Sequence, residues 1–272
     1  MKIFEEREAK ITKASASPAD SDRIFSELKK ISRRLAADCG DLRFAQNTAA
    51  VYNPLVYAAR SHNLYLKLAA SSPKKVIFLG MNPGPWGMAQ TGVPFGEISI
   101  VRDWLGIKTA VDKPENEHPK RPIEGFECTR SEVSGRRLWG LFRERFGKPE
   151  IFFREHYVAN YCPLVFMEES GANITPDKLP REEAAPLFEI CDRALADTID
   201  LLKPQWVIGI GGFAKKRIDK AAALGSAGAN RQYSTAQILH PSPASPKANS
   251  GWDREAVKTL IELGIWQSTT PP

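Results

Sequence analysis

Residues 75–97, KVIFLGMNPGPWGMAQTGVPFGE, decide the fold class and contain the first candidate site. The run at 76–79 is short, apolar and bounded, which is typical of a strand that helices cover on both faces. A loop dense in glycine and proline follows it. Ligands in open α/β sheets bind beyond the carboxyl ends of the strands, so this loop is a candidate ligand site.

Asn82 is the polar side chain at the start of this loop. Pro83 steers Asn82 away from the α region, and Gly84 and Gly87 let the backbone approach a ligand closely. A side-chain amide can hold a water molecule or hydrogen-bond a base edge, but it is a poor general base and no nucleophile. Asn-Pro and Pro-Gly pairs also mark ordinary turns, so the residue chemistry alone leaves a structural turn equally open.

The rest of the chain alternates between strand and helix patterns. Further strands are expected at 157–161, 206–210 and 236–239, and helices at 24–39, 53–68, 98–105, 131–147, 187–198, 214–224 and 252–263. This alternation predicts an α/β fold, with three α/β/α layers around a central, mostly parallel four-stranded sheet. We expect one domain over 1–272, with 1–20 as a flexible or loosely docked arm. The long polar connection at 108–130 is expected to be functional or mobile.

Composition narrows the class of protein. The formal net charge of +6 favours a polyanionic partner without establishing one. Cys39, Cys128, Cys162 and Cys191 form no C-x-x-C pair, and the histidines lack metal-site spacing, so buried thiols are favoured and no metal or cofactor is expected. The chain has no apolar run of membrane-spanning length, and its charged start differs from a signal peptide. These features predict a soluble, intracellular protein.

Three polar residues, Asn82, Asn160 and His240, stand at or just beyond the ends of predicted strands. The carboxyl ends of parallel strands share one edge, so the three side chains are predicted to converge on one pocket. His240 begins the segment HPSPASPKANSGW at 240–252, whose serine, asparagine and lysine residues suit phosphate contacts. A structural histidine and an ordinary surface loop remain open on these residues alone.

Three blocks, at 80–97, 160–164 and 240–252, together resemble the single-strand-selective monofunctional uracil-DNA glycosylases. The similarity runs in register over 41–264 and includes YNPLVYA at 52–58, VRDWLGI at 101–107, HPKRP at 118–122 and SEVSG at 131–135. The resemblance implies the uracil-DNA glycosylase fold and hydrolysis of the N-glycosidic bond of uracil and 5-substituted uracils in DNA. The product would be an abasic site.

The resemblance also implies where such an enzyme works and what it contacts. Its partner would be uracil-containing DNA, single- or double-stranded, with no membrane and no obligatory protein partner. A bacterial chain would be cytoplasmic and nucleoid-associated, and a eukaryotic chain would be nuclear. Lys247 is the only lysine in the three blocks and belongs to the DNA-contacting segment, so no lyase step is expected.

Specific roles follow from the resemblance for individual residues. Asn82 would position the hydrolytic water, and His240 would donate a hydrogen bond to uracil O2. Phe95 would stack on the flipped base, and Asn160 would hydrogen-bond its Watson–Crick edge. The other implied contacts are Met81, Gly84 and Met88 for the substrate and Ser242, Pro243, Ala244, Ser245, Lys247 and Asn249 for DNA.

The 240–252 segment departs from the family pattern at two positions. Ala244 and Ser250 stand where the family has larger, often basic side chains. A small residue fills a vacated base stack poorly, so the wedge that replaces the flipped base is expected to be weak.

A dinucleotide-binding protein is the main alternative from another class. The stretch GIGGFA, with Gly209, Gly211 and Gly212, follows a predicted strand and matches the relaxed G-x-G-x-x-A pattern. It lies late in the chain, however, and no acidic residue stands between Lys220 and the fourth strand to bind a ribose. A tight strand-to-helix turn is the better interpretation. A non-catalytic DNA-binding relative is the third possibility, which the presence of Asn82 and His240 disfavours.

Overall fold

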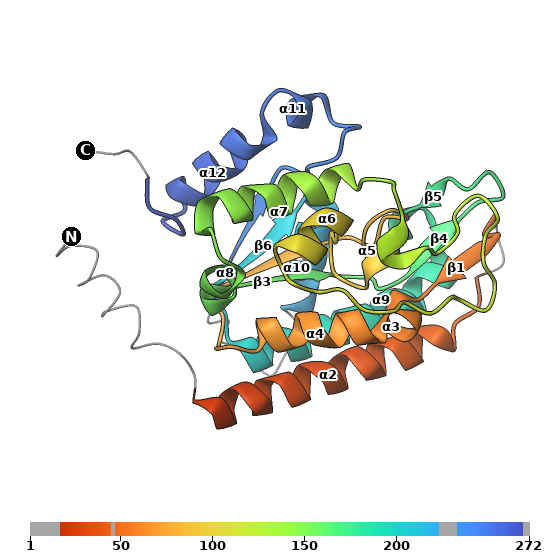
Figure 1. Cartoon of the computed structure of the whole chain (residues 1–272), viewed down its shortest axis with the longest axis horizontal. Coiled ribbons are helices and arrows are strands. Elements are labelled where there is room, and N and C mark those ends of the chain that lie inside the picture. The colour runs from red at the N-terminus through yellow and green to blue at the C-terminus, as the bar shows by residue number, and fades with distance from the viewer. Residues whose placement is uncertain (1–16, 45–46, 223–232, 269–272) are drawn as a thin grey trace.

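The centre of the computed structural model, which describes residues 17–44, 47–222 and 233–268, is a parallel four-stranded sheet (Figure 1). Its strands, in the order in which they pair, are β3 (His156–Asn160), β2 (Val76–Gly80), β6 (Trp206–Ile210) and β7 (Ser234–Ile238). Every residue of β2 is buried, because β2 has a strand on each side and helices on both faces. The predicted parallel sheet is therefore confirmed.

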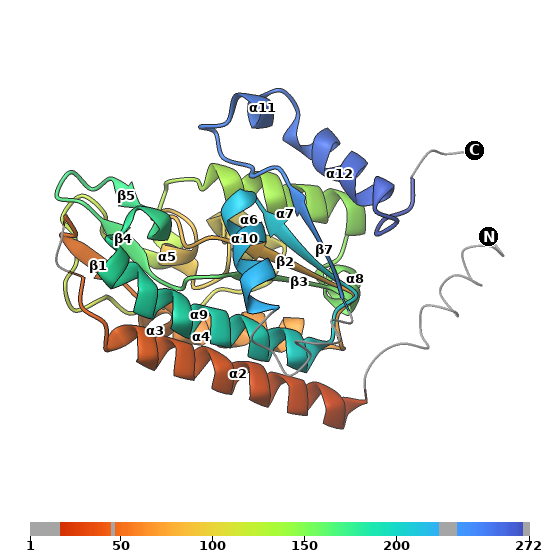
Figure 2. The ribbon, with the colours of Figure 1, turned by 180° about the vertical axis from the view of Figure 1, so that it is seen from behind.

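Helices form a layer on each face of this sheet (Figures 1 and 2). One face carries α7 (Val133–Phe146) and α12 (Trp252–Glu262), and the other carries α9 (Arg181–Leu202) and α10 (Gly212–Ala221). Phe78 of β2 meets Phe142 of α7 with 5.2 Å between the ring centroids. The three-layer α/β/α prediction is confirmed.

The first described helix, α2 (Pro18–Gly40), packs along the outside of α9. Ser17 caps it by accepting a hydrogen bond from the Asp20 N–H at 3.1 Å. The expected arm at 1–20 is therefore wrong for 18–20, which belong to the helix, whereas 1–16 lie outside the described residues. The predicted end of this helix, at residue 39, lies one residue before the observed end at Gly40.

A tyrosine of α4 (Ala59–Ala69) closes the free edge of the sheet at β3. The Tyr65 hydroxyl donates to the Val158 carbonyl at 2.5 Å and lies 3.2 Å from the Val158 N–H, which donates to it. Unpaired groups on an edge strand invite pairing with another chain. Tyr65 therefore satisfies one N–H and one C=O that the edge would otherwise expose.

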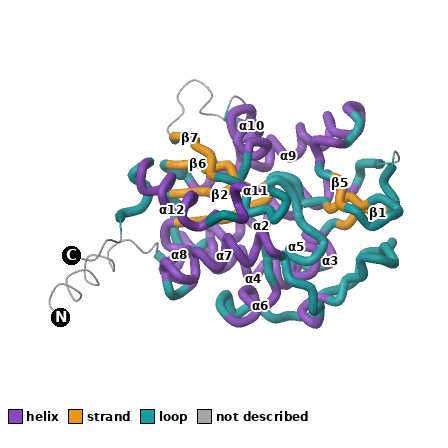
Figure 3. The backbone as a smooth tube through the Cα atoms, turned by 90° about the horizontal axis from the view of Figure 1, so that it is seen from above, coloured by secondary structure: helices purple, strands orange, loops and turns teal. Residues whose placement is uncertain are grey.

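Several short elements are absent from the sequence-based prediction. A second sheet contains β1 (Ala50–Tyr52), β4 (Val165–Met167) and β5 (Asn173–Ile174), paired antiparallel in that order. Figure 3 shows it apart from the central sheet, at the end of the molecule away from α12. The other unpredicted elements are α5 (Met88–Thr91), α8 (Pro149–Glu155), α11 (Pro246–Asn249) and the 3-10 turns Gly125–Glu127 and Pro176–Lys178. The helix predicted at 98–105 is present as α6 (Ile98–Asp103), and the one predicted at 53–68 is present as two helices, α3 (Pro54–Tyr57) and α4. Strands of two or three residues are too short for alternation to reveal.

The four cysteines are free and buried, as predicted. Cys191 contacts both Cys162 and Cys39, and burial raises the pKa of its thiol. Of the helices in the described part of the chain, none is long and apolar enough to cross a membrane.

A buried ion pair anchors the carboxyl end of β3. Arg217 of α10 and Asp192 of α9 are both buried and pair with each other. The Tyr161 hydroxyl donates to Asp192 Oδ1 at 2.9 Å, and the Arg217 guanidinium lies 5.1 Å from the centroid of the Tyr161 ring. Tyr161 directly follows Asn160, so the pair fixes the strand end that carries a candidate site residue.

Replacing Asp192 with alanine is expected to destabilise the fold by about 3–5 kcal/mol, because the Arg217 charge would stay buried without its partner. The free energy of unfolding, measured with urea, tests this. Asp197→Ala is the matched control: it breaks the exposed pair with Arg34, which contributes less than about 1 kcal/mol. Equal losses in the two variants would show that the buried pair does not anchor the fold.

Candidate active site

The loop at 80–97 is held rigidly by its own hydrogen bonds and by α7. Thr91 Oγ1 lies 3.2 Å from the carbonyls of Gly87 and Gly96, and Trp139 of α7 donates its indole N–H to the Pro94 carbonyl at 2.9 Å. Phe95 adopts a positive φ of 55°, which is rare outside glycine. Strained backbone of this kind is found where function requires one fixed side-chain position.

Phe95 and Asn160 lie side by side above Gly80. Gly80 of β2 pairs with Asn160 of β3, and a Cβ atom at Gly80 would overlap both the Phe95 ring and Asn160 Oδ1. Asn160 Nδ2 contacts Met88 Sδ at 3.3 Å. Asn160 Oδ1 is buried and has no hydrogen-bond partner within the described ranges. The site thus places the face of the Phe95 ring beside a buried acceptor, Asn160 Oδ1, that a hydrogen-bond donor of a ligand could satisfy.

His240 completes this group from the end of β7. Its ring centroid lies 6.1 Å from that of Phe95. The Ser242 N–H donates to His240 Nδ1 at 3.1 Å, so the neutral ring carries its proton on Nε2. Desolvation lowers the pKa of His240 to about 4. A neutral imidazole with a donating Nε2–H therefore faces the site at neutral pH.

The turn proposed as a dinucleotide-binding loop makes room for His240. Gly211 has a φ of 90°, and a Cβ there would lie 3.2 Å from His240 Cβ. Gly209 packs against the backbone of Lys215, where a Cβ would come within 2.5 Å of its nitrogen. These glycines therefore serve the strand-to-helix turn and the histidine, which favours the tight-turn interpretation over the dinucleotide one.

Asn82 lies two residues beyond Gly80, at the carboxyl end of β2. Its Nδ2 donates to the Leu164 carbonyl at 3.2 Å, which turns Oδ1 away from that carbonyl. The pairing of the strands continues past β3, because the Cys162 N–H donates to the Met81 carbonyl at 2.8 Å. The predicted edge therefore brings Asn82 and Met81 to the same end of the sheet as Asn160.

Glu132 is a site residue that the sequence-based reasoning missed. Its carboxyl group lies where a Cβ of Gly84 would stand, and its Cγ is against Gly87. Its Oε1 accepts a hydrogen bond from the Ser134 N–H at 3.3 Å, and desolvation raises its pKa. Gly84, expected to contact substrate, thus packs on Glu132. The SEVSG block at 131–135 contains Glu132, which was assigned no role from the sequence.

The segment at 240–252 is braced by Arg137 of α7. Arg137 donates to the Pro241 carbonyl at 3.0 Å and to Asn249 Oδ1 at 2.9 Å. Asn249 Nδ2 also donates to the Pro243 carbonyl at 2.9 Å. Asn249, predicted to bind DNA, therefore uses its amide within the protein.

Of the other predicted DNA-binding residues, the two serines make hydrogen bonds within the segment and the remaining three are exposed. Ser242 Oγ accepts from the Ala244 N–H at 3.2 Å, and Ser245 caps α11. Pro243, Ala244 and Lys247 are exposed. The segment therefore presents a small exposed tip and one cation, and its contact with DNA stays a prediction.

Comparison with known proteins decides the family. The family model described as the uracil DNA glycosylase superfamily matches residues 69–261. This chain belongs to the uracil DNA glycosylase superfamily. Over 253 residues it is 48% identical to the "Single-strand selective monofunctional uracil DNA glycosylase" of Bos taurus, covering 93% of this chain and 92% of that protein. The relative of the same name from Rattus norvegicus is 48% identical over 232 residues, 85% of this chain and 82% of its own. The resemblance inferred from the sequence is confirmed.

A solved structure supports the fold of this superfamily member. The crystal structure of wild-type SMUG2 from Pedobacter heparinus aligns with a TM-score of 0.58 at 14% identity, over 86% of this chain and 97% of that one. In the parts of the chain that the structure describes, no three His, Cys, Asp or Glu residues are placed to hold a metal ion.

The protonation state of His240 is open to a direct test. A ¹⁵N NMR titration is expected to give a pKa of about 4, with Nε2 protonated at neutral pH, because burial disfavours the cation. The same shift predicts how stability depends on pH. As pH falls below about 6.5, His240 binds a proton in the unfolded state but not in the folded state, so the free energy of unfolding decreases toward pH 4. A titration near 6.5, or a proton on Nδ1, would contradict the geometry.

Proposed function

We propose that this protein is a monofunctional DNA glycosylase that hydrolyses the N-glycosidic bond of uracil in DNA and leaves an abasic site. The observation that carries the proposal is the convergence of Phe95, Asn160 and His240 from three distant stretches of the chain. The names of the relatives agree with it. An enzyme that acts on a base must flip it out of the stack and recognise it by stacking and edge contacts.

Asn160 supplies selection for uracil. Its buried Oδ1 lacks a partner among the described residues, and an unsatisfied buried acceptor costs about 1–3 kcal/mol. Uracil N3–H provides the missing donor, and Asn160 Nδ2 can turn from Met88 to uracil O4. Cytosine presents an acceptor at N3 and a donor at C4, so both contacts would be repulsive.

His240 and Asn82 supply the chemistry. As the glycosidic bond breaks, the base becomes an anion, and a donor aimed at its O2 is worth more in the transition state than in the ground state. The Nε2–H of neutral His240 is that donor. The sugar carbon is then already electrophilic, so Asn82 Oδ1 needs only to orient a water molecule toward it.

We propose that Glu132, which packs against the loop at 80–97, favours positive charge on the sugar. Its carboxyl group packs on Gly84, two residues from Asn82. In its ionised form it would stabilise the oxocarbenium character of the transition state by charge attraction. Burial disfavours this ionised form, since desolvation raises the pKa of Glu132.

We propose no lyase step, and the positions of Lys74 and Lys247 support this. Lys74 has a pKa lowered to about 7 by burial, which would suit a Schiff-base amine. However, Lys74 precedes β2, at the opposite end of the sheet from Asn82, and it bonds the Phe153 carbonyl. Lys247 is exposed on α11. Neither lysine is placed at the sugar carbon in this proposal.

We extend the proposal to 5-substituted uracils such as 5-hydroxymethyluracil. In the proposed contacts Asn160 and His240 hydrogen-bond N3, O4 and O2, and neither contacts the substituent at C5. DNA is the proposed partner, as single strand or duplex. The expected nuclear or nucleoid-associated location stays a prediction that depends on this substrate.

Asn82→Ala and His240→Ala are each expected to lower the single-turnover rate of uracil release by about 10²-fold or more, because each loses a transition-state contact. The assay is release of uracil from single-stranded and duplex oligonucleotides without added metal or nucleotide. Gly40→Ala serves as the control, since Gly40 lies in α2 without a positive φ and a Cβ there meets no atom within 4 Å. Absence of uracil release by the folded wild-type protein would refute the glycosylase proposal and favour a non-catalytic relative.

Replacing Asn160 with aspartate is expected to narrow the difference between uracil and cytosine, because a protonated carboxyl can donate to cytosine N3. The measurement compares release rates of both bases from otherwise identical oligonucleotides. An unchanged preference for uracil would remove Asn160 from the recognition assignment while leaving the catalytic roles intact.

A further inference from the structure

Two arginines of the connection at 108–130 gather on one tryptophan of the active-site loop. The guanidinium carbons of Arg121 and Arg130 lie 5.1 Å and 5.4 Å from the centroid of the Trp86 ring. Trp86 stands four residues after Asn82 and beside Gly87, which packs on Glu132. We call Trp86, Arg121 and Arg130 the Trp86 cluster. It has no part in the chemistry derived above.

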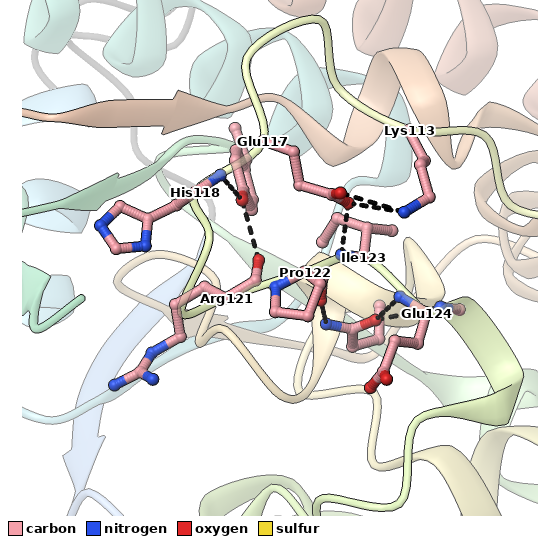
Figure 4. A network of polar contacts seen from close by, with 10 residues as sticks. Lys113, Glu117, His118, Arg121, Pro122, Ile123 and Glu124 are labelled. Carbon is pink, nitrogen blue, oxygen red and sulfur yellow. Dashed lines mark hydrogen bonds and ion pairs between the residues drawn. The ribbon is translucent and has the colours of Figure 1, made fainter.

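The connection that carries Arg121 is fixed to the active-site loop by buried hydrogen bonds (Figure 4). Gln90 of α5 is fully buried and donates to the carbonyls of Pro85 at 3.1 Å and Pro122 at 3.0 Å. Its Oε1 accepts from the N–H groups of Glu124 at 2.8 Å and Gly125 at 3.0 Å. The side chain of Gln90 therefore joins the loop at 80–97 to the connection.

Tyr52 fixes the same connection from the second sheet. Its hydroxyl accepts from the His118 N–H at 2.6 Å and donates to the Arg121 carbonyl at 2.8 Å. Figure 4 shows the Arg121 guanidinium pointing away from this network. The backbone of Arg121 is thus held in place while its charge is directed elsewhere, toward Trp86.

The charges of the cluster are uncompensated. Within the described ranges Arg121 and Arg130 have no carboxylate partner, whereas Arg34, Arg60 and Arg102 each pair with an aspartate. Arg121 Nη1 donates to the Lys120 carbonyl at 2.8 Å, and its Nε is buried without a partner in the described part of the chain. Two like charges on one ring repel each other, so the cluster is stabilised by an anion that bridges them.

The donor geometry selects the kind of anion. A guanidinium group presents a planar fork of N–H donors that matches phosphate, and the indole face orients it. The cluster sits on the loop after β2, and the 240–252 segment follows β7, with β6 between the two strands. A nucleic acid strand that passes the base pocket therefore has cationic groups at two separate places along its path.

We propose that the Trp86 cluster is a second DNA-binding site, which holds backbone phosphates of the strand that carries the flipped nucleotide. The proposal rests on the proposed function for its substrate. It also accounts for the small Ala244 and Ser250, because a grip on the strand beside the pocket compensates for a weak wedge. A phosphate grip is independent of base sequence and needs only one strand.

The salt dependence of DNA binding tests this site without requiring catalysis. Affinity for a uracil-free single strand of about 20 nucleotides is measured by fluorescence anisotropy over a range of salt concentrations. Arg121→Gln and Arg130→Gln are each expected to reduce the slope of log K against log salt by about 0.7, which is one phosphate contact on a single strand. At about 0.1 M salt each loses roughly fivefold in affinity.

Two further variants separate this role from a general loss of charge or of fold. Arg33→Gln removes an exposed arginine from α2, on the far side of α9, and is expected to leave the slope unchanged. Arg121→Lys keeps the charge and is expected to keep most of the slope. Trp86→Ala is expected to weaken binding as the arginine variants do, and Trp86→Phe is expected to restore it, because a phenyl ring also orients guanidinium groups.

Kinetics locate the contact on the substrate. With a long single-stranded substrate, the double variant of Arg121 and Arg130 is expected to raise KM and leave kcat unchanged. With single strands of decreasing length, the difference in KM between this variant and the wild type is expected to shrink as the strand loses the phosphates that reach the cluster. An unchanged salt slope in the folded double variant, or an equal change in Arg33→Gln, overturns the proposal. Since the binding assay uses uracil-free DNA, a failed glycosylase assay would leave this result interpretable.

Discussion

The candidate active site depends on one close approach, between the backbone of Gly80 and the side chains of Phe95 and Asn160. The parallel register of β2 and β3 places Gly80 beside Asn160. Because Gly80 lacks a side chain, the Phe95 ring and the Asn160 amide both occupy the space that a Cβ would fill. Any larger residue would separate the aromatic face from the amide. The proposed base pocket therefore requires both the register that pairs Gly80 with Asn160 and the loop conformation that places Phe95 over Gly80.

Fixed contacts hold the residues next to this close approach in place. The buried Arg217–Asp192 pair holds Tyr161, the neighbour of Asn160. The Ser242 N–H holds His240 in one tautomer. Polar groups that are held in this way lose little further entropy or solvation when a substrate binds, so their interactions are available to the transition state. This preorganisation supports the proposed roles of two neutral groups, an amide and an imidazole, alongside the charge proposed for Glu132.

The proposed DNA binding depends on charge, whereas the proposed base recognition depends on shape and hydrogen bonds. Phosphate contacts position the strand without reading its sequence, and they depend on salt rather than on shape. In this chain the 240–252 segment offers a small tip and one lysine, while Arg121 and Arg130 stand on Trp86 beside the water-positioning loop. In the proposed mode of binding, positive charge at both places compensates for the weak wedge expected at Ala244.

The sequence by itself determined the parallel sheet, the helical layers and the three strand ends that carry Asn82, Asn160 and His240, since these depend on apolar periodicity along short stretches. Family resemblance supplied their proposed roles. Only the tertiary structure revealed Glu132 against Gly84, Arg137 bracing Asn249 and the two arginines on Trp86. Such contacts join residues that are far apart in the chain, and their distances are set by how elements pack. The hydrophobic periodicity of a short stretch cannot predict these contacts, because they depend on how closely separate elements of the fold approach each other.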